Sequence, residues 1–266
     1  MRHLRLYVAL MHLNLRAGWQ FPGQMLIQLV LTLVFDVITL GVLWVVLDHF
    51  GSVGGWTFWE VALLYGLKDL AQIVYASLFW TGGLDTLVIR GELDRYLVRP
   101  LNPLFHFLAD HEQSAHRIPV AMTSIALIVL SSTQVPIQWT LAKVLGLTLG
   151  FSGGVLIYTG VQLLGGSIAF WTKREDTLTV LLPWTANTFL QFPLHIYGIG
   201  VMAVLTFVIP FAFINFVPVA FVIDRGSDLL FPSWIVFGTP LFGVALILIG
   251  HWVWQRGLHA YESAGT

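Results

Sequence analysis

One stretch of the sequence matches a motif that carries hydrolytic chemistry. Gly150-Phe-Ser-Gly-Gly154 fits the pattern G-x-S-x-G, in which a serine hydroxyl attacks a carbonyl carbon after a histidine has accepted its proton. The motif falls in the middle of an apolar run, so it would belong to an intramembrane serine protease. The nearest histidines by predicted position, His195 and His251, are expected near the inner ends of their own spans. Ser152 therefore lies at the wrong depth, and small residues on packed helices give the same pattern without catalysis.

Other motifs of catalysis or cofactor binding are incomplete. His111-Glu-Gln-Ser-Ala-His116 has one residue too many for a helical zinc motif, since residues five apart on a helix point about 140° away from each other. No G-x-x-x-x-G-K-[ST] motif occurs, so the chain has no loop of the kind that holds ATP phosphates. The absence of cysteine excludes disulfides, thiolate zinc sites and cysteine nucleophiles. We therefore expect no catalytic residue, no metal and no cofactor bound by this chain.

Ionisable residues inside apolar runs form a second kind of candidate site. Asp36 precedes a glycine-rich turn at 48–56, and Lys68 and Asp69 follow it, each about 18 Å from the turn if both flanks are helical. Charges at this depth cost about 2.5–3.5 kcal/mol each on insertion scales, so they usually pair or line a polar path. We predict an Asp36–Lys68 ion pair, with Asp69 facing another helix or a translocation path. The alternative is that Lys68 extends to the interface or pairs only with Asp69.

A charged segment, Gly91–Pro103, stands out from its apolar surroundings. The chain is 57% hydrophobic and only 10% charged, yet this short run and its preceding residue hold Arg90, Glu92, Asp94, Arg95 and Arg99. Its pattern predicts a two-turn helix that begins after Gly91 and is ended by Pro100 and Pro103. One stripe would be apolar, formed by Leu93, Tyr96, Leu97 and Pro100, beside a charged flank formed by Glu92, Arg95 and Arg99. Such a helix suits a socket on another protein; the alternative is a solvated loop lying on lipid headgroups.

Composition places the whole chain in a membrane. A mean hydropathy of +0.80 over 266 residues, with 19 Phe and 11 Trp, gives more apolar surface than a soluble globule buries. The formal net charge of −1 offers nothing to attract nucleic acid. The predicted fold class is thus an all-α integral membrane protein that contacts membrane lipids.

The whole chain, 1–266, is predicted to be one membrane domain. Hydropathy and proline positions divide this domain into an interfacial amphipathic helix at 1–20, six transmembrane helices and the charged segment at 91–103. A further segment, Thr177–Gln191, is broken by Pro183 and is predicted to be interfacial or re-entrant. The six spans are expected at about 24–47, 57–79, 114–132, 141–171, 198–222 and 233–254.

Two further patterns concern packing and orientation. Gly146, Gly150 and Gly154 recur at four-residue intervals, a small-residue face that permits close helix approach, either within the chain or in a dimer. With the N-terminus inside, ten basic residues lie on cytoplasmic segments, while only Lys143 and Arg225 lie outside. This asymmetry predicts an inner-membrane protein with both termini in the cytoplasm.

Three separated stretches carry a family resemblance. They are GELDRYLVRPLNPLF at 91–105, WEVALLYGL at Trp59–Leu67 and LTFVIPFAFINFVP at Leu205–Pro218, and together they resemble the permease subunit of ATP-binding-cassette (ABC) exporters of the type-2 family. The resemblance implies two copies of an ATP-binding subunit that hold ATP and Mg, a second permease, identical or homologous, and a cytoplasmic coupling helix. The residues expected to contact the ATP-binding subunit are Glu92, Leu93, Asp94, Arg95, Tyr96, Leu97 and Arg99.

The resemblance leaves the substrate open and does not remove every alternative. An ion-coupled secondary transporter or a channel would need no partner, and would use Asp36, Lys68 and Asp69 as its own ion site. The presence or absence of an ATP-binding partner discriminates these two classes.

Overall fold

The computed structural model describes residues 22–100, 102–110, 117–173 and 177–261, and across these residues the chain is helical, without a β-strand. Within the described ranges, five helices are long and apolar enough to cross a membrane, and a bent helix pair makes a sixth crossing if it counts as one span. The predicted all-α membrane class is therefore confirmed. The amphipathic helix predicted at 1–20 lies outside the described residues.

The long helices follow the apolar runs of the sequence, separated by short elements. The five candidate spans are α2 (Pro22–Phe50), α3 (Phe58–Leu78), α7 (Arg117–Gln134), α8 (Leu141–Ser167, continued by α9, Ala169–Thr172) and α13 (Thr239–Ala260). Between them lie α4 (Leu84–Ile89), α5 (Asp94–Leu97), α6 (Pro103–Asp110), α10 (Thr177–Phe189), α11 (Gly198–Ala203) and α12 (Phe216–Val222). Short 3-10 turns at 194–197, 211–213, 226–228 and 233–238 and a π-helical turn at 204–208 complete the chain.

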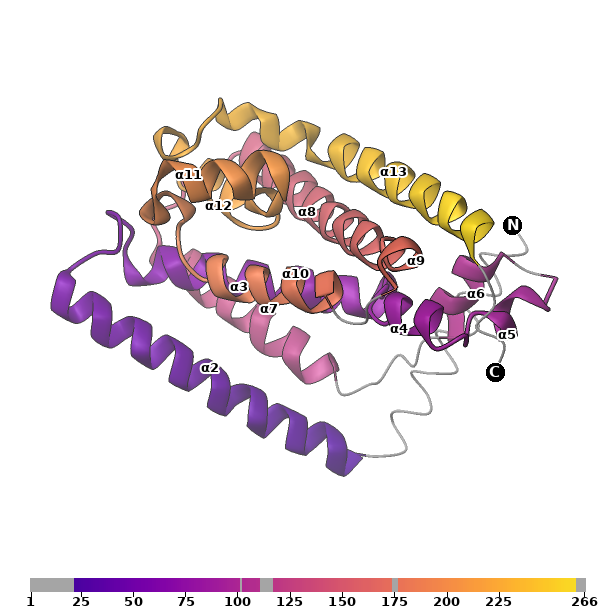
Figure 1. The fold of residues 1–266 in the computed structure, drawn as a ribbon. Helices are drawn as coiled ribbons and strands as arrows, with labels where there is room; N and C mark the ends of the chain where they lie inside the picture. Colours follow the sequence, from indigo (N-terminus) through magenta and orange to yellow (C-terminus); the bar gives the residue numbers. More distant parts are fainter. Residues whose placement is uncertain (1–21, 101, 111–116, 174–176, 262–266) are drawn as a thin grey trace.

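Helix α2 lies at the side of the bundle. It packs on α7 and, less extensively, on α3, and Figure 1 shows it along the outer edge of the bundle. Only 6% of the residues in its most apolar stretch are buried inside the protein, against 56% in the corresponding stretch of α3. Its outer face is therefore left for lipid or for another protein.

The centre of the bundle is formed by α8. This helix packs along α13 for most of its length, and also against α3 and α12. Its three glycines at four-residue spacing face the same chain: a Cβ added at Gly146 would meet the ring of Phe221, and one at Gly154 would lie 2.7 Å from Cα of Ile214. A Cβ at Gly150 would collide with Pro218. The small-residue face thus serves packing inside this chain.

The fifth span predicted at 198–222 is not one continuous helix. Helix α10 and the segment 194–208 meet at an angle of 105°, and the chain then turns through Phe211–Phe213 into α12. Pro193 and Pro210 stand at these breaks, where a missing N–H ends helical hydrogen bonding. Asn215 compensates for the break at the bend, because its buried side-chain amide donates to the carbonyls of Leu64 and Leu190 at 3.1 and 2.7 Å.

The two ends of the bundle have different makeup. We call the end that carries α4, α5 and α6 the Arg95 end, and the end that carries the turns at 51–57 and 223–233 the Arg225 end (Figure 1). A large apolar core fills the bundle toward the Arg225 end, and a second, smaller core joins α4 and α5 to the adjoining parts of α8, α9 and α13. The charged segment therefore rests on its own hydrophobic core.

Candidate functional site

The charged segment forms less helix than its pattern predicts. Only Asp94–Leu97 is helical, so α5 is a single turn instead of two. Pro103 does not end this helix but begins α6, where the side chain of Asn102 accepts hydrogen bonds from the N–H groups of Leu104 and Phe105 at 3.0 and 3.3 Å. Proline suits the first position of a helix because the N–H it lacks has no partner there. Leu101 lies outside the described residues.

Two of the three predicted apolar anchors are buried within this chain. Leu93 is fully buried and Tyr96 is 2% exposed, both in the smaller core. The Tyr96 ring meets the ring of His106 edge-on at 4.8 Å, and its hydroxyl accepts a hydrogen bond from Arg95 at 3.0 Å. A helical stripe of this kind looks the same in sequence whether it is covered by its own chain or by a partner. The expectation that Leu93 and Tyr96 insert into a partner is therefore corrected: they support α5 from beneath.

The remaining residues of the segment form its outer surface. Leu97 is 45% exposed and Val98 is 83% exposed, an apolar pair at the tip of the Arg95 end. Around this pair, Glu92, Arg95 and Arg99 are also exposed. Arg95 forms a loose ion pair with Glu92 at 3.5 Å, and Arg99 bonds the ring nitrogen Nε2 of His106 at 2.8 Å. The tip thus combines a small apolar contact with charges held in place by neighbours.

The end of α13 touches the same segment. Tyr261, just beyond α13, lies beside Asp94, and burial together with this carboxylate raises the pKa of the Tyr261 hydroxyl to about 12. Trp254 on α13 is fully buried and packs edge-on against Phe170 of α9 at 5.0 Å. The charged segment is therefore joined to α9 and α13, which sequence separation alone does not suggest.

The polar groups inside the bundle pair differently from the prediction. Lys68, which is 3% exposed, forms its ion pair with Asp69 at 2.8 Å and donates to the amide oxygen of Asn187 at 3.4 Å. Asp36 instead accepts a hydrogen bond from the hydroxyl of Tyr65 at 3.2 Å. The predicted Asp36–Lys68 pair is thus wrong, because depth along two helices does not fix the direction in which each side chain points. Tyr65 and Asn187 were not predicted, although both are polar residues in apolar runs.

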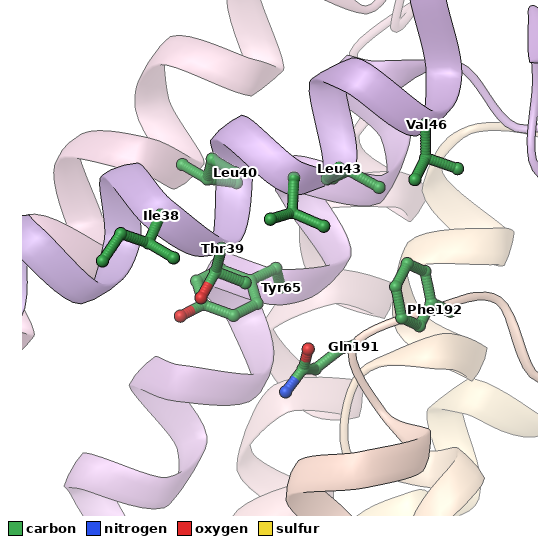
Figure 2. A pocket seen from close by; sticks show the side chains of 9 residues that line it. Ile38, Thr39, Leu40, Leu43, Val46, Tyr65, Gln191 and Phe192 are labelled. Carbon is green, nitrogen blue, oxygen red and sulfur yellow. The ribbon is translucent and has the colours of Figure 1, made fainter. Parts of the chain in front are cut away.

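A cavity of about 260 Å³ lies next to this cluster, between α2, α3 and the end of α10. Figure 2 shows the hydroxyls of Thr39 and Tyr65 close together on one side, with the amide of Gln191 opposite them. The ring of Phe192 and the side chains of Leu43 and Val46 form the other end. The cavity therefore has a polar end and an apolar end.

The Arg225 end is closed by a second polar cluster. Arg225 binds both carboxylate oxygens of Glu60, at 3.0 and 3.1 Å, and donates to the carbonyl of Gly55 at 2.7 Å. The indole N–H of the fully buried Trp56 donates to Asp228 at 2.8 Å. Asp224, the residue before Arg225, forms a second ion pair with Lys143 at 2.6 Å. These contacts fasten the turn at 51–57 to the turn at 223–228.

The protease motif does not form a catalytic site. Ser152 is exposed, and its hydroxyl donates to the carbonyl of Leu149 on its own helix at 3.1 Å. His195 lies at the Arg225 end, where its Nε2 bonds the carbonyl of Gly54, and not at the inner end where sequence placed it. His251 bonds Gln255 one turn along α13. No group of residues in the described ranges is arranged to hold a metal ion, and His111–His116 lies outside those ranges.

Comparison with known protein families identifies the family. A family model described as ABC-2 family transporter protein matches residues 33–265, which is most of the chain. The match includes the charged segment, the cavity and the polar cluster of the Arg225 end. No curated protein and no solved structure shows significant similarity to the chain.

Proposed function

Because the chain belongs to the ABC-2 family of transporter membrane proteins, we propose that it is the permease subunit of an ATP-driven ABC exporter. In this proposal the chain forms a translocation path together with a second permease, identical or homologous. Two copies of an ATP-binding subunit lie at the Arg95 end and hold the ATP and Mg. The chain itself hydrolyses nothing.

The observation that carries the proposal is the surface of the Arg95 end. Leu97 and Val98 expose an apolar pair at its tip, while Arg95 and Glu92 flank the pair with opposite charges. A central apolar contact with a charged rim is the usual anatomy of a specific protein interface. Beneath it, Leu93 and Tyr96 tie the tip to a packed core, so a partner pushing on the tip would move packed helices instead of a free loop.

Charge asymmetry supports the orientation in this proposal. The Arg95 end carries Arg90, Arg95 and Arg99, whereas the Arg225 end carries Lys143 and Arg225, both of which are paired with acids. Basic residues concentrate on the cytoplasmic side of membrane proteins. We therefore propose that the Arg95 end and both termini lie on the cytoplasmic side of the inner membrane.

The test is purification of the tagged full chain in lipid nanodiscs from its native membrane, followed by identification of co-purifying proteins and an ATPase assay. We expect a stoichiometric ATP-binding subunit. The double variant Leu97→Asp/Val98→Asp should lose most of this subunit, because two charges would replace the exposed apolar contact, while the variant permease itself stays in the membrane.

A matched control separates docking from general surface damage. Trp234→Ser alters a residue that is 67% exposed at the opposite end of the bundle, so it should leave the partner bound. If the wild-type chain purifies alone and without ATPase activity, the proposal fails and an ion-coupled carrier built on Asp36, Lys68 and Asp69 becomes the better hypothesis.

A further inference from the structure

One continuous face of α2 borders the cavity between α2, α3 and α10. Thr39, Leu40, Leu43 and Val46 line it, and Asp36 begins the same face one turn earlier, since residues three and four apart lie on one side of a helix. Tyr65 connects the two parts: its ring lines the cavity, and its hydroxyl donates to Asp36. Asp36 does not line the cavity itself, but its carboxylate lies directly beside the Tyr65 hydroxyl that forms the polar end.

The charges around this end do not balance. Within the described part of the chain, Lys68 is the one positive group in the cluster, and it lies 2.8 Å from Asp69. Among the residues that the structure describes, no basic side chain forms an ion pair with Asp36, whose carboxylate accepts a hydrogen bond from the Tyr65 hydroxyl and has the Thr123 hydroxyl beside it. One negative charge is thus left over at membrane depth, where an uncompensated charge is costly.

We propose that this cavity binds a small amphipathic monocation, with its cationic head at Asp36 and its apolar body between Leu43, Val46 and Phe192. That this ligand is a transport substrate rests on the function proposed above. A cation supplies the charge that Lys68 cannot supply, because Lys68 is already engaged by Asp69. Thr39, Tyr65 and Gln191 offer oxygen atoms to orient an ammonium head.

The volume limits the ligand. A cavity of about 260 Å³ is slightly smaller than typical sites for drug-sized ligands, which are about 300–1,000 Å³. The aromatic and aliphatic lining of the far end suits a single ring. Phenyltrimethylammonium is therefore a suitable probe, and tert-butylbenzene has the same shape without the charge.

The experiment is equilibrium dialysis of these two probes, and of benzenesulfonate as an anion, against the full chain in nanodiscs, with empty nanodiscs as the blank. We expect saturable, stoichiometric binding of phenyltrimethylammonium and no binding of the other two above the blank. Asp36→Asn should weaken the binding of the cation by at least about tenfold, because removal of one partner of a desolvated charge pair is costly. Asp48→Asn, which alters an exposed acid on the same helix outside the cavity, should bind as the wild type does.

A second variant keeps the test decisive if Asp36→Asn does not fold. Leu43→Trp retains the carboxylate but fills the apolar end, and it should also abolish binding. Equal binding of the cation and its neutral analogue, absence of cation binding, or unchanged binding in both variants would overturn the proposal. The assay contains neither ATP nor an ATP-binding subunit, so its failure is distinct from failure of the co-purification test.

Discussion

The two ion pairs of the Arg225 end predict very different costs for neighbouring substitutions. Arg225 grips Glu60 through two hydrogen bonds, and their side chains are 31% and 10% exposed. Asp224, the preceding residue, pairs with Lys143, but its side chain is 75% exposed. We predict that Arg225→Met destabilises the protein strongly and that Asp224→Asn does not.

The magnitudes follow from burial. Removal of one partner of a buried pair costs about 3–5 kcal/mol, and the partial exposure of Arg225 lowers this to about 2–3 kcal/mol because water screens the remaining charge. In the Lys143–Asp224 pair the lysine side chain is 11% exposed and only the carboxylate is well exposed, at 75%. In Asp224→Asn the amide oxygen and water can still accept from the lysine, so no buried charge is left without a partner and we expect a cost of about 0–1 kcal/mol. Asp224 has a positive φ of 61°, which asparagine also tolerates, so Asp224→Asn adds little backbone strain.

The assay is thermal unfolding of the full chain in nanodiscs, followed by tryptophan fluorescence. At about 2–4 °C per kcal/mol, Arg225→Met should lower the Tm by about 4–12 °C, and Asp224→Asn by no more than about 4 °C. Glu60→Gln combined with Arg225→Met should cost less than the sum of the single changes, since no unpaired carboxylate remains. Equal losses for Arg225→Met and Asp224→Asn would refute the reasoning from burial.

Three further predictions concern packing and protonation. Leu93→Ala should lower stability by about 2–5 kcal/mol, measured as a lower Tm, because the side chain is fully buried. Gly154→Ala should cost about 1–3 kcal/mol, since its added Cβ would meet backbone atoms, whereas Gly41→Ala, with no atom within 4 Å of the added carbon, should be neutral or stabilising in the same measurement. The Tyr261 hydroxyl has a pKa of about 12 against an ordinary 10.0, so the unfolded chain loses this proton at lower pH and the stability should fall as pH rises from about 10 to 12. An absorbance titration at 295 nm checks this, with Tyr261→Phe subtracted from the wild type to isolate the signal of this tyrosine. Asp94→Asn should lower the pKa of Tyr261.

Sequence reasoning reached the fold class and the main spans because long apolar runs have few alternatives in a membrane. It failed in the predicted fifth span, 198–222, which is divided into short elements, and the prolines at 193 and 210 permit these breaks without specifying their directions. The bend depends on Asn215 bridging Leu64 and Leu190, residues distant in sequence. Only the folded chain brings these groups together.

At the candidate sites, periodicity identified faces but not their neighbours. The stripe of Leu93 and Tyr96 is real, yet its own chain covers it. The depth of Asp36 and Lys68 along their helices gave no information on rotation about the helix axes, which directs Lys68 to Asp69 and Asn187. Pairings over 100 residues of separation, such as Glu60 with Arg225, leave no local pattern in the sequence.

The smaller core has a consequence for the order of synthesis. Leu93 and Tyr96 share this core with Trp254 and Tyr261, about 160 residues further along the chain. Chains emerge from the ribosome at about 5–20 residues per second, so the part of this core that comes from α13 is missing for on the order of ten seconds after α5 is made. The support beneath the tip at Leu97 and Val98 is complete only when α13 is in place. Assembly with a partner at this surface would then select finished chains over incomplete ones.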